Sequence, residues 1–387
     1  MLTLQEKTVA ALVSGMFPDS AAFDFRAPLR YSSDNHLHIV VVGTGRWAEA
    51  WVKMAILVCH YPNYERRRDL RTRITWAGVE RPEVEEFVYE HRELFDNCRW
   101  RTVDLRDKDI DIDMHRPMYE GRRKDFVDVE VEFVLGRFTH PALQQKLAKW
   151  ESDPERQLTL VFCGDDRERN MRYASHALAR HPVGAPPVQF FALGDKCDEV
   201  CPGIRVFDVP VDIDARFERM MDMAKYLNYF YNASYELKHV PTELPREDVE
   251  KAWECVMSPQ MRLSNLFNIL TIATKMRTLG HSRDDWQTFY ALTASEIEEM
   301  TPTEHNRWSV ERLLQGSRPC TDSERLEIEK DISLKKKYKK ERNAHYDLVA
   351  FDELGEDETG RNVARYDSDL IAAIPLIVKS FTDENDE

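Results

Sequence analysis

A short glycine-containing segment near the start of the chain carries the clearest chemical signal. The residues Gly43-Thr44-Gly45-Arg46-Trp47-Ala48 follow the apolar run 38–42 and precede a segment with apolar residues at helical spacing. Gly43 permits a sharp turn, Gly45 lets the backbone approach a pyrophosphate, and Ala48 is the small residue where helix meets strand. The helix N-terminus adds free N–H groups and a partial positive charge. The pattern predicts a strand–turn–helix unit that binds phosphates, with five ligand-contacting residues: Gly43, Thr44, Gly45, Arg46 and Trp47.

An acidic residue after the second predicted strand is a further candidate for this site. Residues 73–79 predict a strand, and Glu80 follows it. In dinucleotide-binding folds an acidic residue at this point contacts a ribose hydroxyl. Glu80 lies further along the chain than the usual ~20 residues, so an alternative is that it only begins the loop before Pro82. The unit is typical of a site for NAD(P) or another adenine nucleotide.

Residues 303–316 form the second chemically distinctive stretch. Pro302 suits a helix start and Gly316 a helix end. Within it, Glu304 and Trp308 share one face of the predicted helix, and His305 and Arg312 nearly share another. We interpret four basic residues as a candidate phosphate-binding rim, with a solvated basic run as the alternative: Arg312, Lys336, Lys340 and Arg342.

The C-terminal residues resemble the RyR domain, the repeat module named after the ryanodine receptors and also found in bacterial proteins. The matching elements are Glu304-His305-x-x-Trp308, Gly316, His345-x-x-Leu348-Val349-x-Phe351-x-x-Leu354 and a final helix with an Ile-rich face. Tyr346 and Ala350 stand where family members usually have proline, and Ser317 where they have an aromatic residue.

This resemblance covers roughly residues 290–380 and implies a small module of about four helices. In bacteria such modules are often attached to TrkA-like Rossmann domains and look like sensors of nucleotide-derived signals. The resemblance implies a second ligand site formed by Glu304, His305, Trp308, Arg312 and His345. The competing interpretation is structural, since polar helix residues often serve folding and Trp308 is large enough for a core position.

The elements that must hold these residues follow from the periodicity of the sequence. Strand patterns alternate with helical ones from 37 to 212, which predicts a doubly wound, Rossmann-like parallel sheet. Apolar residues then recur at helical spacing, which predicts helices over 259–276 and 284–290, and a charged helix is predicted over 323–335. The predicted fold class is therefore α/β followed by α. The predicted organisation is an N-terminal helix and loop (1–36), a nucleotide-binding domain (37–212), a helical linker or assembly region (213–290), the RyR-like domain (291–380) and an acidic tail (381–387).

Two patterns suggest metal ligands, and neither is complete. Asp109, Asp111, Asp113 and Glu120 have the spacing of a calcium loop, but Met114 takes the place of the required glycine. Cys197-x-x-x-Cys201 has no second Cys or His pair nearby to complete a zinc site. We predict no metal cofactor.

Composition limits the class of protein. The chain has 387 residues, a formal net charge of −15 and seven scattered cysteines. The acidic balance argues against direct nucleic-acid binding, and no apolar run approaches the ~20 residues of a membrane span. No signal peptide is evident, and the unpatterned cysteines indicate a reducing compartment, so we expect a cytoplasmic protein. The acidic surface and large helical middle favour a homo-oligomer.

Three functions are compatible with these patterns. The first is a regulatory protein in which the Rossmann and RyR-like domains recognise a nucleotide or nucleotide-derived small molecule and act on an effector. The second is an NAD(P)-dependent oxidoreductase, although the Rossmann region lacks the Tyr-x-x-x-Lys proton-transfer pair. The third is an oligomeric scaffold with a vestigial nucleotide loop. No hydrolase motif is present, so the sequence favours a non-catalytic sensor.

Overall fold

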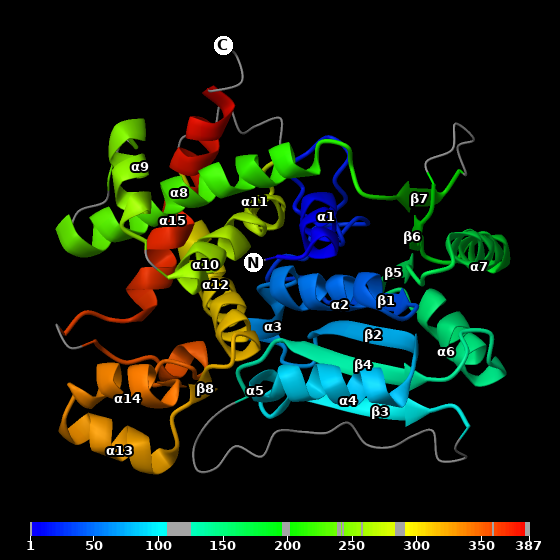
Figure 1. The fold of residues 1–387 in the computed structure, drawn as a ribbon, viewed down its shortest axis with the longest axis horizontal. Coiled ribbons are helices and arrows are strands. Elements are labelled where there is room, and N and C mark those ends of the chain that lie inside the picture. The colour runs from blue at the N-terminus through cyan, green and yellow to red at the C-terminus, as the bar shows by residue number, and fades with distance from the viewer. Residues whose placement is uncertain are drawn as a thin grey trace.

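A seven-stranded parallel sheet forms one half of the protein (Figure 1). The computed structural model describes residues 2–106, 125–195, 202–237, 241, 244–256, 258–282, 291–357 and 360–383. The strands are β1 (His36–Val42), β2 (Thr72–Val79), β3 (Arg99–Asp104), β4 (Val129–Leu135), β5 (Arg156–Phe162), β6 (Gln189–Leu193) and β7 (Ile204–Phe207).

The strand order is β3-β4-β2-β1-β5-β6-β7, and all neighbouring strands are parallel. Without the edge strand β3, this is the order of the doubly wound dinucleotide-binding fold. The strand order reverses between β1 and β5, which pair from His36–Arg156 to Val42–Phe162. Ligands of such sheets bind beyond the carboxyl ends of the strands at this reversal, which is where the Gly43–Arg46 turn lies.

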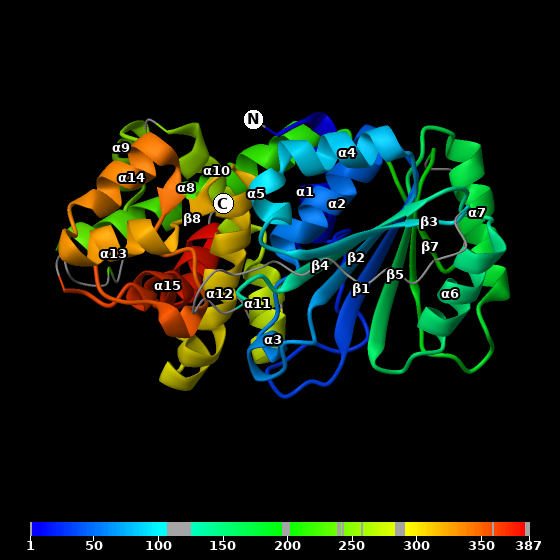
Figure 2. The same cartoon turned by 90° about the horizontal axis from the view of Figure 1, so that it is seen from below.

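Helices cover both faces of the sheet, as Figure 2 shows edge-on. Because side chains alternate along a strand, Ile39 and Val41 of β1 face one core while Val40 and Val42 face the other. The first core includes α1 (Leu4–Val13), α2 (Arg46–Val58), α4 (Arg81–Glu90) and α5 (Arg92–Phe95). The second includes α6 (Pro141–Glu151) and α7 (Arg167–Arg180). The predicted α/β architecture is confirmed.

The helical half packs on the α2 side of the sheet (Figures 1 and 2). Its elements are α8 (Ile213–Leu237), α9 (Arg246–Glu254), α10 (Pro259–Ile269), α11 (Ile272–Leu279), α12 (Ala294–Leu314), α13 (Asp322–Lys330), α14 (Leu334–Arg342) and α15 (Ala364–Asp383). Strands β8 (Arg318–Pro319) and β9 (Ala344–His345) form a short parallel pair, and Phe351–Glu353 is a 3₁₀ turn. One hydrophobic core runs from α2 through α8, α12 and α15, so the domain limits at 212 and 290 stay predictions.

Three helix predictions were wrong in detail. The helix predicted to start at Pro302 is the second half of α12, which continues through this proline. Proline removes one backbone donor, but its neighbours Met300 and Thr303 are buried, and tertiary packing outweighs the local penalty. The predicted helix 259–276 is two helices, α10 and α11. The helix predicted from Ser323 to Lys335 ends at Lys330, and the basic run after it forms α14.

Some predictions fall on residues that the structure does not describe. These are the acidic segment 107–113 with Glu120, the pair Cys197 and Cys201, the helix expected over 284–290, and the end of the tail, 384–387. Within the described part of the chain, no helix has the length and apolar content needed to cross a membrane.

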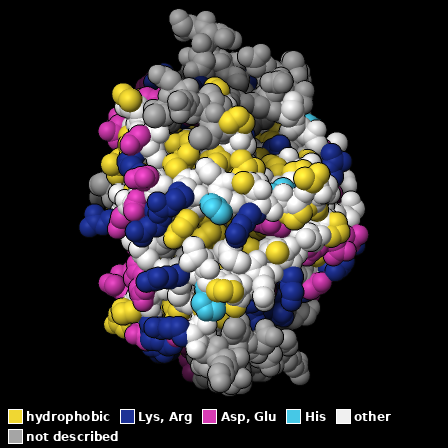
Figure 3. All heavy atoms as spheres, turned by 90° about the vertical axis from the view of Figure 1, so that its right-hand side faces the viewer, with side chains coloured by type: hydrophobic (Ala, Val, Ile, Leu, Met, Phe, Trp, Pro, Cys, Tyr) yellow, Lys and Arg dark blue, Asp and Glu magenta, His cyan; other side chains and the backbone are white. Residues whose placement is uncertain are grey.

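The end of the molecule beside α6 and α7 carries mixed charge. Figure 3 looks onto this end and shows Lys and Arg side chains interspersed with Asp and Glu, with apolar groups between them. Binding a nucleic-acid backbone relies on gathered positive charge. Over its described residues, this end therefore differs from a typical nucleic-acid surface.

Candidate functional site

The Gly43–Arg46 turn has the backbone geometry that its sequence predicts. Gly43 has a φ of +140°, and a Cβ there would lie 2.5 Å from the backbone nitrogen of Gly164, which follows β5. Gly45 has a φ of +79° and precedes the first residue of α2. Both positions require glycine, because an L-residue would be strained and, at Gly43, would also clash. The turn is therefore specified by close approach of β1 and β5.

The anion position of this turn is taken by carboxylates of the chain itself. The N–H of Gly45 donates to Oε1 of Glu83 at 3.0 Å, and the N–H of Glu80 donates to Oε2 at 3.1 Å. Asp165 adds a carboxylate whose Oδ1 lies 3.4 Å from the position a Gly45 Cβ would occupy. A pyrophosphate needs these N–H groups and is repelled by carboxylates. In this arrangement the turn does not fit a dinucleotide cofactor.

The remaining residues assigned to this turn have other surroundings. Arg46 is an exposed first residue of α2, and Thr44 is half-buried beside it. Trp47 packs edge-on against Phe207 of β7, with ring centroids 5.8 Å apart. Glu80 precedes α4 and is joined to it through the Glu83 hydrogen bond. Sequence reasoning missed Glu83, although its position three residues after Glu80 is that of a capping box.

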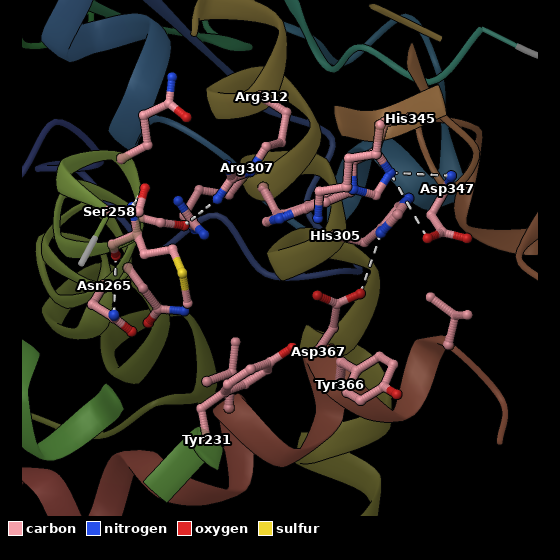
Figure 4. Close-up of a pocket in the computed structure, with 18 of the residues that line it drawn as sticks. Tyr231, Ser258, Asn265, His305, Arg307, Arg312, His345, Asp347, Tyr366 and Asp367 are labelled. Carbon is pink, nitrogen blue, oxygen red and sulfur yellow. Dashed lines mark hydrogen bonds and ion pairs between the residues drawn. The ribbon is translucent and has the colours of Figure 1, made fainter. Parts of the chain in front are cut away.

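A cavity of about 540 Å³ lies in the helical half, which is within the range of small-molecule sites (Figure 4). It is bounded by α8, α10, α12, α14 and α15 and by the residues after β9. Four of the five residues assigned to the second site line it: His305, Trp308, Arg312 and His345. The structure thus brings together residues from two separate sequence motifs.

Aromatic rings form part of the wall of this cavity. Trp308 is half-buried and stacks on His305, with centroids 5.6 Å apart and planes inclined by 29°. The ring of His345 meets Trp308 edge-on at 4.8 Å. Tyr231 and Tyr366, on α8 and α15, lie 6.1 Å apart on another part of the lining. Such rings offer faces on which a flat ligand group can stack.

His305 connects α12 to two other parts of the cavity wall. Its Nδ1 lies 3.2 Å from Oδ2 of Asp367, and its Nε2 lies 2.9 Å from the carbonyl oxygen of Val349. Both acceptors favour a doubly protonated ring. Burial alone would lower the pKa of His305, but the hydrogen bond and charge of Asp367 raise it above its ordinary value. The two acceptors and the raised pKa favour the protonated form of His305, whose ring supports that of Trp308.

Positive charge gathers at the end of the cavity formed by α12 and α14. Arg312 donates to Oγ of Ser264 at 3.0 Å, and Lys335 lies 2.9 Å from Oδ1 of Asp347. Lys339 lines the same end and has no hydrogen-bond or ion-pair partner among the described residues. Lys339 is exposed at the rim of the cavity, and the protein atoms around its ammonium group together with the nearby Arg312 charge lower its pKa. This end is therefore suited to an anion.

His345 lies among these cations as a neutral ring. Its Nδ1 accepts from the backbone N–H of Asp347 at 3.3 Å. Burial, followed by the charges of Lys339 and Arg312, lowers the pKa of His345 well below its ordinary value. With Nδ1 accepting, the proton of the neutral ring is on Nε2. His345 thus adds a neutral hydrogen-bond donor to the wall.

Glu304, the fifth assigned residue, lies behind the cavity wall. It is fully buried and accepts from Asn268, Lys275 and Arg307. Arg307 also donates to Oε2 of Glu311 at 2.8 Å. These attractions hold the pKa of Glu304 at about 2 although burial acts to raise it. Its position indicates a structural role, linking α10, α11 and α12.

Three amides line the end of the cavity between α8 and α10, and sequence reasoning did not assign them to a ligand. Asn268 donates to Glu304 at 2.7 Å, and its Oδ1 is buried without a partner in the described structure. Asn265 donates to Oδ1 of Asn228 at 3.4 Å, which leaves Nδ2 of Asn228 similarly unpartnered. An unsatisfied buried group costs about 1–3 kcal/mol. The wall at this end therefore contains one donor and one acceptor that have no partner in the described structure, and both atoms are buried below the cavity surface.

Of the remaining rim candidates, Lys336 lines the cavity, whereas Arg342 pairs with Glu324 at 3.1 Å. Lys340 is exposed on α14 and is not part of the lining. Among the described residues, no cluster of three or more His, Cys, Asp or Glu side chains could hold a metal ion.

No family model matches the chain, and neither a curated protein nor a solved structure is a match for it. Its own geometry therefore carries the interpretation.

Proposed function

We propose that the protein is a nucleotide-binding regulatory protein whose ligand occupies the helical cavity. One observation carries the proposal: Arg312, Lys335 and Lys339 face the same cavity as the half-buried ring of Trp308. Cations bind phosphate, and an exposed aromatic face stacks on a base. A nucleotide combines these two groups in one small molecule. The assignment of residues 291–380 to an RyR-like module belongs to the same proposal.

The position of α12 supports a regulatory role. One face of this helix carries His305, Trp308 and Arg312 toward the cavity. On the same helix, Nδ2 of Asn306 donates to Oε1 of Glu65 at 2.8 Å, and Glu65 belongs to α3 (Asn63–Arg66) beside the sheet. A ligand that shifts α12 would therefore change a contact with the Rossmann half, which is the coupling that a sensor needs.

Carboxylates around Gly45 favour the cavity over the glycine turn as the ligand site. NAD(P)-dependent oxidoreduction would require Glu83 to leave the Gly45 N–H. The cavity requires no such rearrangement of its cationic end. We therefore propose that the ligand binds in the helical half. The Gly43–Arg46 turn then has a structural role, closing the crevice between β1 and β5.

Isothermal titration of the full chain against ATP, ADP-ribose, NAD and cyclic oligonucleotides tests this function. We expect at least one of these to bind with a micromolar or lower Kd, and the same ligand to raise the melting temperature. Absence of binding by every ligand at micromolar concentrations would sink the proposal. Turnover of NAD(P)H with any substrate in an absorbance assay would instead favour the oxidoreductase.

A further inference from the structure

The cavity has two chemically different ends. Figure 4 shows Ser258 and Asn265 on one side and His345 and Asp347 on the other, with His305 and Arg307 between them. The first side comes from α8 and α10 and carries amides and hydroxyls. The second comes from α12, α14 and the residues after β9 and carries the cations. A ligand that fills the cavity must therefore carry uncharged hydrogen-bonding groups at one end and negative charge at the other.

The net charge of the cationic end depends on which charged side chains are already paired with one another inside the protein. Lys275, Glu304, Arg307 and Glu311 form a buried group of two cations and two anions. His305 is matched by Asp367. These pairs leave no net charge for a ligand.

Arg312 lies 3.5 Å from Oε1 of Glu311, but the single charge of Glu311 is already counted against Arg307. Four charged groups therefore remain to be counted at that end: Arg312, Lys335, Lys339 and Asp347. Three cations against one carboxylate leave two positive charges. Lys336 also lines this end and has contacts of its own. The electrostatic complement is a group with two negative charges, which a phosphate monoester or diphosphate supplies and a single phosphodiester does not.

The amide end offers a fixed pair of hydrogen-bonding atoms. The carboxylate of Glu304 can only accept, so it holds the amide nitrogen of Asn268 and turns Oδ1 of Asn268 away from itself. Asn265 donates to Oδ1 of Asn228, and Nδ2 of Asn228 has no partner in the described structure. Both residues are at most 2% exposed, and both line the cavity. Both atoms are buried in the wall, so a base must draw the two amides toward the cavity; once there, an acceptor and a donor match the groups on the pairing edge of a nucleobase.

We propose that the cavity binds a nucleotide with a terminal phosphate monoester or diphosphate, with the phosphate between Arg312 and Lys339 and the base at Asn228 and Asn268. This inference rests on the proposed function and adds two things to it: the chemical class of the ligand and its orientation in the cavity. The ring of Trp308, which lies beside His345 and Arg312, stacks against the ligand.

The test compares nucleosides, their 5′-monophosphates and their 3′,5′-cyclic monophosphates by isothermal titration of the full chain. For the base that binds best, we expect the 5′-monophosphate to bind at least about tenfold more tightly than the nucleoside and the cyclic diester. Equal or tighter binding of the cyclic diester would overturn the inference and leave the proposed function standing. Failure of every nucleotide, including those in the broader panel, would overturn both.

Two substitutions test the two ends separately. Lys339→Met should abolish most of the preference for the monophosphate over the nucleoside, whereas the control Lys340→Met, on the same helix but outside the cavity lining, should leave it unchanged. Asn228→Ala should weaken the nucleoside and the monophosphate by the same factor. A preference that survives Lys339→Met, or an Asn228→Ala effect confined to the monophosphate, would contradict the assigned direction. Melting temperatures of the variants establish that each is folded.

Discussion

The backbone N–H of Gly45 donates a 3.0 Å hydrogen bond to the carboxylate of Glu83, which reaches it from the start of the next βα unit. The phosphate-binding turn of a Rossmann sheet is thus satisfied by an acidic side chain of the same chain. The fold of this half is a doubly wound parallel sheet, and the ligand site that we propose lies in the helical half.

Removing this carboxylate should open the turn to anions. In Glu83→Ala the Gly45 N–H is free and one negative charge is gone from the anion position. We expect affinity for NAD to increase about tenfold or more relative to the wild-type chain, measured by titration calorimetry. Glu85→Ala, an exposed change on the same helix, is the control. An NAD affinity that is the same in a folded Glu83→Ala variant as in the wild-type chain would contradict the role of Glu83 in closing the turn.

Trp308 should contribute to affinity through its ring face. Trp308→Phe keeps an aromatic ring and should weaken nucleotide binding a few-fold, while Trp308→Ala should weaken it by tenfold or more, because base–aromatic stacking contributes about 1–3 kcal/mol. Titration with the best ligand measures both. Since Trp308 is half-buried, thermal unfolding must accompany the binding data. Unchanged affinity in a folded Trp308→Ala variant is incompatible with stacking on this ring.

Glu304 should matter for stability. Glu304→Gln removes the negative charge that compensates Lys275 and Arg307, all three of which are at most 3% exposed at the side chain. Leaving a buried charge uncompensated typically costs about 3–5 kcal/mol, so urea unfolding should show a loss of this order. The matched control is Glu298→Gln, an exposed position on the same helix α12. Equal stability of both variants would contradict the structural role.

The buried His305–Asp367 pair makes stability depend on pH. The pKa of His305 is raised in the folded state, so the stabilisation from this pair is complete below the ordinary histidine pKa of 6.5 and is lost as pH rises through the folded value. The wild-type chain should have a larger free energy of unfolding than His305→Gln, and this difference should shrink as the pH rises from about 6 to about 9. Urea unfolding at several pH values in this range measures it. The exposed His176→Gln serves as a control. A constant difference across this range would indicate a neutral His305.

The strands and the glycine turn were predictable because their signals are local. Apolar runs fixed the positions of β1, β2 and β5, and the spacing of Gly43 and Gly45 indicated the turn that joins β1 to α2. The closure by Glu83 was not predictable in the same way, since it depends on a side chain from a different βα unit reaching the turn. The continuation of α12 through Pro302 depends on tertiary burial rather than local propensity.

The candidate site was predictable in part for the same reason. His305, Trp308, Arg312 and His345 belong to motifs that stand out in the sequence, and all four line one cavity. The amide end comes from α8 and α10, whose asparagines resemble ordinary helix-linking residues until the packing brings them together. Glu304 shows the converse: its motif position suggested a ligand contact, whereas its partners are Asn268, Lys275 and Arg307.

The most direct test of the central claim is an experimental structure of the full chain with the tightest-binding nucleotide. We expect density for the ligand in the helical cavity, against Trp308 and between α10 and α14, with Glu83 still bound to the Gly45 N–H. Density for the nucleotide phosphates at the Gly43–Arg46 turn, with Glu83 displaced and the helical cavity without ligand, would contradict it.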